Sequence, residues 1–191
     1  MDKFLSYVQK HNDFANASRF RVYVVPPADL RRPDGISNSS VVEGLAFQCE
    51  IAELPARNLS TADIRYYGPR FKTPYQTEFQ DITLNFFCME NMWEKRLFDA
   101  WMSYIQDDTT YDLRYADQYS FSDITIEQYD KRGNIVYKSL LTKAFPISVN
   151  QINLAWNEEN VPRLSVVFAY TRCINLIDRE VIRPQVEDER F

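Results

Sequence analysis

The residues of this chain that could perform acid–base or nucleophilic chemistry are few and scattered. His11 is the only histidine, so a Ser-His-Asp or Cys-His arrangement would depend on that one imidazole. Cys49, Cys88 and Cys173 lie far apart, without C-x-x-C spacing and in odd number, which indicates reduced, buried thiols rather than disulfides. No histidine or cysteine has a partner at metal-ligand spacing, and the four glycines form no phosphate-binding loop. We therefore expect no enzyme, no cofactor and no metal site.

Acids and amides do follow a pattern, because they occupy the polar face of three predicted strands. These residues are Gln48, Glu50, Asp81, Thr83, Asn85, Asp123, Thr125 and Glu127. One interpretation is an ordinary solvated face, since antiparallel sheets commonly wet one side. Another is a polar, acidic lumen that, repeated around a ring, would repel DNA phosphates and let DNA slide past. A third, a hydrolase that uses Glu50 and Asp81 as paired carboxylates on a sugar polymer, has only the abundance of acids in its favour.

The elements that carry these residues are mostly strands. Alternating apolar and polar side chains predict strands over residues 19–25, 46–54 and 81–89, and β-hairpins over 122–141 and 151–171. In the 46–54 strand, Phe47, Cys49 and Ile51 are expected on the apolar face. The fold class is thus mainly β, antiparallel, with two sheets packed as a sandwich or barrel.

One strong helix is expected to flank the sheets. Asn91 has the position of an N-cap with Glu94 three residues later, and apolar side chains then repeat at helical spacing as far as Ile105. A short amphipathic helix or arm is expected over residues 4–14. Residues 27–44, rich in Pro, Gly and Ser, are expected to form a loop, and the chain is expected to leave the core from Arg172 onward.

A protruding hairpin is expected over residues 57–74, with its turn at Gly68 and Pro69. Aromatic and basic side chains alternate near this turn, and six of them are candidates for contacts between subunits or rings: Arg65, Tyr66, Tyr67, Arg70, Phe71 and Lys72. The alternative is a surface hairpin that packs on its own domain, and the sequence leaves both open.

Length and charge fit one soluble domain. The 191 residues suit a β-domain over 1–175, with an arm at about 56–75 and a loop at 27–45, followed by a charged tail over 176–191. A net charge of −5 with scattered basic residues disfavours tight DNA binding. No apolar stretch is long enough for a membrane helix or a signal peptide. We expect folding in a reducing cytoplasm.

Several strings resemble, in order and spacing, the tail tube protein family of contractile-tailed (myovirus-type) bacteriophages. They include Phe47-Gln48-Cys49-Glu50, Ala52-Glu53-Leu54-Pro55, the segment from Ile82 to Trp101, and the C-terminal strings Lys143-Ala144-Phe145-Pro146 and Leu154-Ala155-Trp156-Asn157. Tube proteins of type VI secretion and contractile bacteriocins share this fold, so the fold alone does not choose among delivery machines.

The resemblance implies a structural virion protein that forms stacked, hexameric rings inside a contractile sheath. Implied partners are other copies of the chain, the tail sheath, and tape-measure and baseplate proteins, with DNA passing through the lumen during genome ejection and no membrane contact. The implied location is the phage tail, assembled in the bacterial host cytoplasm.

Three alternatives remain open at this point. The loop and the tail look longer than the family pattern, which leaves room for a tube-initiating baseplate protein. A tube subunit of a type VI or bacteriocin-like injection machine is also compatible with the resemblance. From another functional class, a small β-barrel that binds a ligand would explain the many aromatic residues.

Overall fold

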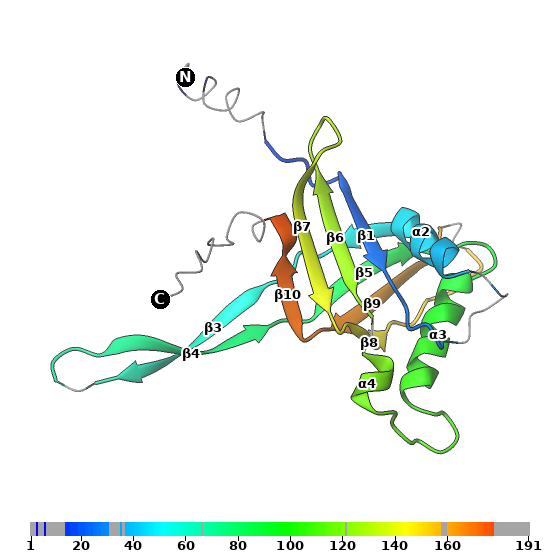
Figure 1. The fold of residues 1–191 in the computed structure, drawn as a ribbon. Coiled ribbons are helices and arrows are strands. Elements are labelled where there is room, and N and C mark those ends of the chain that lie inside the picture. Colours follow the sequence, from blue (N-terminus) through cyan, green and yellow to red (C-terminus); the bar gives the residue numbers. More distant parts are fainter. Residues whose placement is uncertain are drawn as a thin grey trace, which may run out of the picture.

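Strands form where the sequence alternates apolar and polar side chains, and they build two four-stranded antiparallel sheets and a two-stranded hairpin (Figure 1). The computed structural model describes Lys3, Ser6 and residues 14–30, 35, 37–65, 67–120, 122–157 and 160–177. In chain order the strands are β1 (Phe20–Val24), β2 (Cys49–Ala52), β3 (Arg57–Ile64), β4 (Phe71–Phe79), β5 (Ile82–Phe87), β6 (Ile124–Tyr129), β7 (Ile135–Thr142), β8 (Phe145–Val149), β9 (Arg163–Ala169) and β10 (Arg172–Asn175).

The two sheets bury one shared core. The first sheet has the strand order β1-β6-β7-β10 and the second has the order β2-β5-β9-β8. Alternate residues of the central strands point inward and are fully buried, as with Val22 and Ile124 in the first sheet and Leu84 and Val166 in the second. Since both inward faces belong to the same core, the outward faces of the two sheets point to opposite sides of the sandwich.

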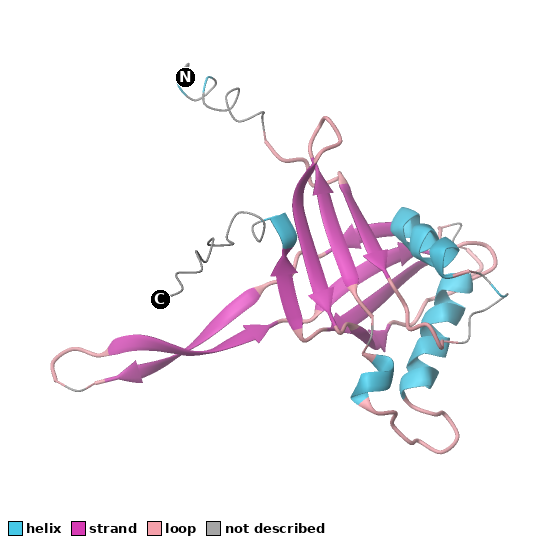
Figure 2. Cartoon of the chain, in the orientation of Figure 1, coloured by secondary structure: helices cyan, strands magenta, loops and turns pink. Residues whose placement is uncertain are grey.

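Helices lie beside one end of the sheets (Figure 2). They are α2 (Asn38–Gln48), α3 (Trp93–Ile105) and the single turn α4 (Ala116–Tyr119). Phe98 of α3 lies 5.5 Å from the ring of Phe86 and 5.9 Å from the ring of Phe168, and it stacks on Trp101 at 6.2 Å. These aromatic contacts anchor the predicted helix to the second sheet.

The expected fold class is confirmed, with one correction in its helical part. Instead of a loop through residue 44, the chain forms helix α2 from Asn38, so more than one helix flanks the sheets. Ser37 is its N-cap and accepts a hydrogen bond from the backbone N–H of Ser40 at 3.3 Å. Val41, Leu45 and Gln48 are buried at helical spacing, so burial stabilises a segment whose Ser and Asn residues resemble a loop.

The strand predicted over residues 46–54 is shorter, and of the side chains predicted on its apolar face only Cys49 packs against the core. Helix α2 continues through Gln48, so Phe47 is exposed and Gln48 is buried. A register shift between Cys49 and Ile51 then inserts an extra residue opposite β5, and Ile51 is half exposed. A bulge of this kind changes which side chains face the core, and sequence periodicity cannot locate it.

The C-terminal part of the chain also differs from the prediction. β9 pairs with β8 rather than with residues 151–156, which lie in a loop between them. β10 pairs with β7, so the chain stays with the first sheet through Asn175 instead of leaving at Arg172. The predicted helix over 4–14, apart from Ser6 and Phe14, and the tail from residue 178 lie outside the described residues, and so does His11.

Candidate functional site

The eight polar residues proposed for a lumen do not share one surface. Thr83 and Asn85 project outward from β5 in the second sheet, with Asp81 exposed just before that strand and Glu50 nearby on β2. Three of the others belong to the first sheet or lead into it: Thr125 and Glu127 on β6, and the exposed Asp123. Gln48 is buried on α2. Two opposite faces therefore carry the candidates.

Glu127 on the first sheet is buried and its charge is compensated. Lys138 Nζ lies 2.7 Å from its carboxylate, and the Tyr129 hydroxyl donates to it at 2.6 Å. Burial raises the pKa of Glu127, but the hydrogen bonds from Lys138 and Tyr129 outweigh this effect, and the net pKa is lowered. Arg21 on the neighbouring strand β1 lies opposite Glu127. This face is therefore a network of paired charges rather than an acidic surface.

The corresponding acid of the second sheet is also paired. Arg163 Nε lies 2.9 Å from the Glu50 carboxylate, and its guanidinium lies 5.8 Å from the centre of the Phe87 ring. On the same outward face, Asn85 of β5 lies opposite Ser165 of β9, and both side chains are uncharged. Near the arm end of this sheet, Glu53 accepts a hydrogen bond from the backbone N–H of Thr83 at 2.9 Å.

The predicted hairpin protrudes from the sandwich as an arm (Figure 1). β3 pairs with β4 along its length, from Arg57 opposite Phe79 to Ile64 opposite Phe71, and Gly68 has a positive φ of 83° in the turn. Tyr67 and Tyr75 are exposed, and so are the basic candidates Arg65, Arg70 and Lys72. Tyr66 lies outside the described residues. The structure thus brings the described contact candidates together near the tip of the arm.

Four exposed apolar side chains near the other end of β5 are not among the predicted sites: Met89, Leu154, Trp156 and Val161. Leu154, Trp156 and Val161 lie in the β8–β9 loop, and Met89 follows Cys88, whose backbone N–H donates to Pro162 O at 3.0 Å. All four side chains are exposed. The sequence predicts Leu154-Ala155-Trp156 as part of a strand over residues 151–156, whereas the structure places this string in the β8–β9 loop.

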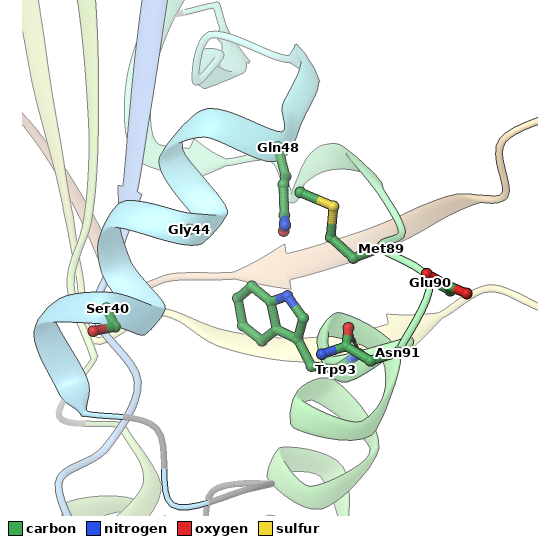
Figure 3. A pocket seen from close by; sticks show the side chains of 7 residues that line it. All are labelled: Ser40, Gly44, Gln48, Met89, Glu90, Asn91 and Trp93. Carbon is green, nitrogen blue, oxygen red and sulfur yellow. Dashed lines mark hydrogen bonds between the residues drawn. The ribbon is translucent and has the colours of Figure 1, made fainter.

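A pocket of about 630 Å³ lies between α2 and the β5–α3 turn (Figure 3). Gln48 and Gly44 of α2 face Met89 and Trp93 across it. Glu94, fully buried, accepts hydrogen bonds from the Met89 backbone N–H at 3.3 and 3.2 Å. Burial raises the pKa of Glu94, although backbone N–H groups and the Gln48 amide lower it in part. The carboxylate therefore ties the turn to α2, which is a structural role.

Among the residues that the structure describes, no group of three or more acids, cysteines or histidines could hold a metal ion. Burial raises the pKa of Cys49 to about 12, which makes its thiol a poor nucleophile. No helix within the described ranges is long and apolar enough to cross a membrane. Glu50 and Asp81, the carboxylates of the hydrolase alternative, lie toward opposite ends of β5, because Glu50 is near Phe86 and Asp81 precedes Ile82.

Chains of two contractile injection systems are similar to this chain in structure. A chain in the six-fold symmetrised baseplate of the anti-feeding prophage has a TM-score of 0.59 and 16% identity, covering 85% of this chain and 95% of that chain. A chain in the extended sheath–tube complex of the PVC extracellular contractile injection system has a TM-score of 0.57 and 22% identity, covering 89% and 95%. Hcp1 from Flavobacterium johnsoniae is less similar, with a TM-score of 0.42, 12% identity and coverage of 82% and 94%. The similarity to the first two chains, at identities below 25%, shows a shared fold.

The family follows from the sequence itself. The model of the family described as phage tail tube protein matches residues 15–175, most of the chain. The chain therefore belongs to the phage tail tube protein family, a family of structural, non-enzymatic proteins. No curated protein compared with the chain matches it.

Proposed function

We propose that this chain is the repeating subunit of a tail tube, assembling into hexameric rings that stack into a hollow conduit for DNA. The family match over residues 15–175 carries the proposal. The two sheets support it, because each has edge strands that would pair with other chains if left exposed, and assembly into a ring covers such edges.

The arm is the proposed contact with a neighbouring subunit or ring. A two-stranded hairpin has little core of its own, yet Tyr67 and Tyr75 present large rings to solvent beside three basic side chains. Exposed aromatic and arginine side chains are the residue types that dominate protein interfaces. Arg65, Tyr66, Tyr67, Arg70, Phe71 and Lys72 remain the residues proposed for this contact.

The lumen is proposed to be lined by only one of the two polar faces, since they point to opposite sides of the sandwich. Cysteines placed at Thr83 and at Thr125 in separate variants, labelled with maleimide-gold before assembly, distinguish the faces. Gold inside the channel of the tube identifies the lumen face, and gold on the outside identifies the other. Because Glu50 and Glu127 are ion-paired, either lumen would be less acidic than the sequence suggests.

Two finer roles are open within the same family. The anti-feeding prophage chains of this fold come from a baseplate and from a tube-terminating cap, so a tube-initiating or terminating component is the second candidate. A tube component would associate with a sheath, as the extended PVC sheath–tube complex does. The proposed location is the virion tail, assembled in the host cytoplasm with tape-measure and baseplate proteins.

The test is negative-stain electron microscopy of the purified protein across a concentration range, with light scattering to size the species. Rings or stacked tubes with a central channel are expected. A monomer that assembles only when a baseplate component is added indicates an initiator-dependent role. A monomer under every condition, together with ligand binding in the apolar pocket of about 430 Å³ between Phe20 and Leu54, would favour the ligand-binding barrel instead.

A further inference from the structure

The sandwich is open along one side, where an edge strand of each sheet runs beside the other. β1 is an edge of the first sheet and β2 is an edge of the second, and the two strands contact each other without pairing. Helix α2 packs against β1 and β5 and so covers part of this side. A pocket of about 430 Å³, to which no residue of α2 contributes, lies in the remaining part, at the Phe20 end of β1.

The walls of this pocket are mainly apolar. Phe20 and Ile126 come from the first sheet, and Ile51, Ala52 and Leu54 come from β2 and the residues after it. Ile126 is buried, whereas Ile51 and Leu54 are about half exposed to solvent. The core therefore continues into a surface that is left uncovered between the two sheets.

Most polar side chains of the pocket already have partners. The Glu50 carboxylate lies 2.9 Å from Arg163 Nε, and the Ser18 hydroxyl donates a hydrogen bond to Asn16 Oδ1 at 2.9 Å. The Gln128 amide is the other polar side chain in the wall. Apolar walls with few polar groups to spare favour an apolar occupant over a charged one.

The N-terminal part of the chain is attached at the rim of the pocket. Ala17 and Ser18 belong to its lining, so the residues that precede them are tethered at the site. The linker from Val8 to Ala17 is nine residue steps long, and when extended it spans about 30 Å. A tether this short gives an effective concentration of roughly millimolar, so that even a weak apolar contact is populated.

Residues 4–8, which we call the N-terminal segment, supply apolar side chains for such a contact. Phe4, Leu5 and Val8 share one face at helical spacing. Lys3 and Ser6 belong to the other face, and both are exposed and helical, with the Ser6 hydroxyl donating to Lys3 O at 3.0 Å. A helix with one polar face of this kind needs a surface for its apolar face.

We propose that the N-terminal segment folds back into the pocket of its own subunit and fills it with Phe4, Leu5 and Val8. The contact closes the open side of the sandwich and shields Ile51 and Leu54 from water. It goes beyond the proposed function, because it is made within one chain and needs no second copy.

Photo-crosslinking of the full chain tests this contact. Phe4→p-benzoylphenylalanine places a photoreactive ring on the apolar face of the N-terminal segment. After irradiation, mass spectrometry of the monomer band is expected to find crosslinks to Ile51, Leu54 or Ile126. Ser6→p-benzoylphenylalanine is the matched control, because Ser6 has a similar tether but belongs to the exposed face. Its crosslinks to the pocket should be about tenfold fewer, the effect of one buried apolar side chain.

Binding of the apolar dye anilinonaphthalene sulfonate gives an independent measurement. The dye fluoresces on exposed apolar surface. Phe4→Ser with Leu5→Ser should open the pocket and raise the affinity for the dye by about tenfold, because the dye no longer competes with the segment. Leu113→Ser with Tyr115→Ser is the matched control, since it removes two exposed apolar side chains from the loop between α3 and α4. It should not raise the affinity.

Each contrary result overturns the inference. Crosslinks found only in a dimer band mean that the segment binds a second copy of the chain. Crosslinks elsewhere on the same chain, equal yields from positions 4 and 6, or unchanged dye binding mean that the segment does not fill the pocket. Assembly seen by electron microscopy is scored separately, so the tube proposal can fail while the crosslinks within the chain remain, and the reverse. Circular dichroism checks that each variant is folded.

Discussion

The ion pair between Lys138 and Glu127 gives a stability prediction that can be worked out from the structure. The change is Lys138→Met, which keeps a long aliphatic side chain and removes the ammonium 2.7 Å from the carboxylate. Glu127 would then be buried with only the Tyr129 hydroxyl and the nearby Arg21 to stabilise its charge. The folded state should lose stability because a buried carboxylate retains its desolvation cost.

The magnitude lies between two limits. Exposed pairs contribute about 0–1 kcal/mol, and breaking a fully buried pair costs about 3–5 kcal/mol. Here the Glu127 side chain is 8% exposed and that of Lys138 is 33% exposed, and two partners of the carboxylate remain. We expect a loss of about 1–2 kcal/mol in the free energy of unfolding, or about 2–8 °C in Tm.

The assay is urea unfolding monitored by tryptophan fluorescence, with Glu127→Gln and the double variant completing a cycle. The pKa of Glu127 is lowered in the fold, so its ionised form contributes stability above the ordinary glutamate value of 4.5. That contribution is lost as the pH falls through the folded pKa. The difference between wild type and Lys138→Met should therefore be full at pH 7 and shrink toward pH 3.

Lys95→Met is the matched control, because Lys95 pairs with Asp99 on the exposed face of α3. It should cost less than about 0.5 kcal/mol. Two results would refute the claim that the network compensates a buried charge. One is a coupling energy between Lys138 and Glu127 no larger than the stability loss of Lys95→Met. The other is a stability difference between wild type and Lys138→Met that does not change with pH.

Three further predictions follow from the core and the backbone. Phe98→Ala removes a ring packed between Phe86, Trp101 and Phe168, and it should cost about 3–5 kcal/mol in urea unfolding. Lys143 has a φ of 57°, so Lys143→Gly should leave stability unchanged or raise it by up to about 1 kcal/mol, measured by Tm. Burial raises the pKa of Glu94, so protonated Glu94 stabilises the fold at low pH, and this contribution is lost as the pH rises. Glu94→Gln should therefore flatten this part of the stability–pH profile.

Periodicity predicted the strands whose two faces differ most. β1, β5 and β6 alternate buried and outward residues, as in Ile82, Leu84 and Phe86 against Thr83 and Asn85, and their positions were confirmed. α2 was missed because Ser, Asn and Gly residues lower its helix propensity. Its buried side chains at 41, 45 and 48, preceded by the Ser37 cap, were the signal in the sequence.

The candidate site was harder to predict than the strands. Alternation tells which residues of a strand share a face, but it does not tell which sheet the strand joins. Thr83 and Thr125 therefore looked equivalent in sequence, whereas pairing places them in different sheets. The partners of Glu50 and Glu127 are distant or cross-strand residues, Arg163 and Lys138, so compensation of their charges depends on register.

The connection of the arm to the second sheet also has a mechanical consequence. β3 continues from β2 and β4 leads into β5, and β5 is hydrogen-bonded on both sides, to β2 and to β9. A pull on the arm along its length would load the hydrogen bonds of β5 in parallel, as shear, rather than opening them one at a time from an edge. The hairpin is therefore continuous with an inner strand of the second sheet, and a displacement of its tip would be transmitted to that whole sheet.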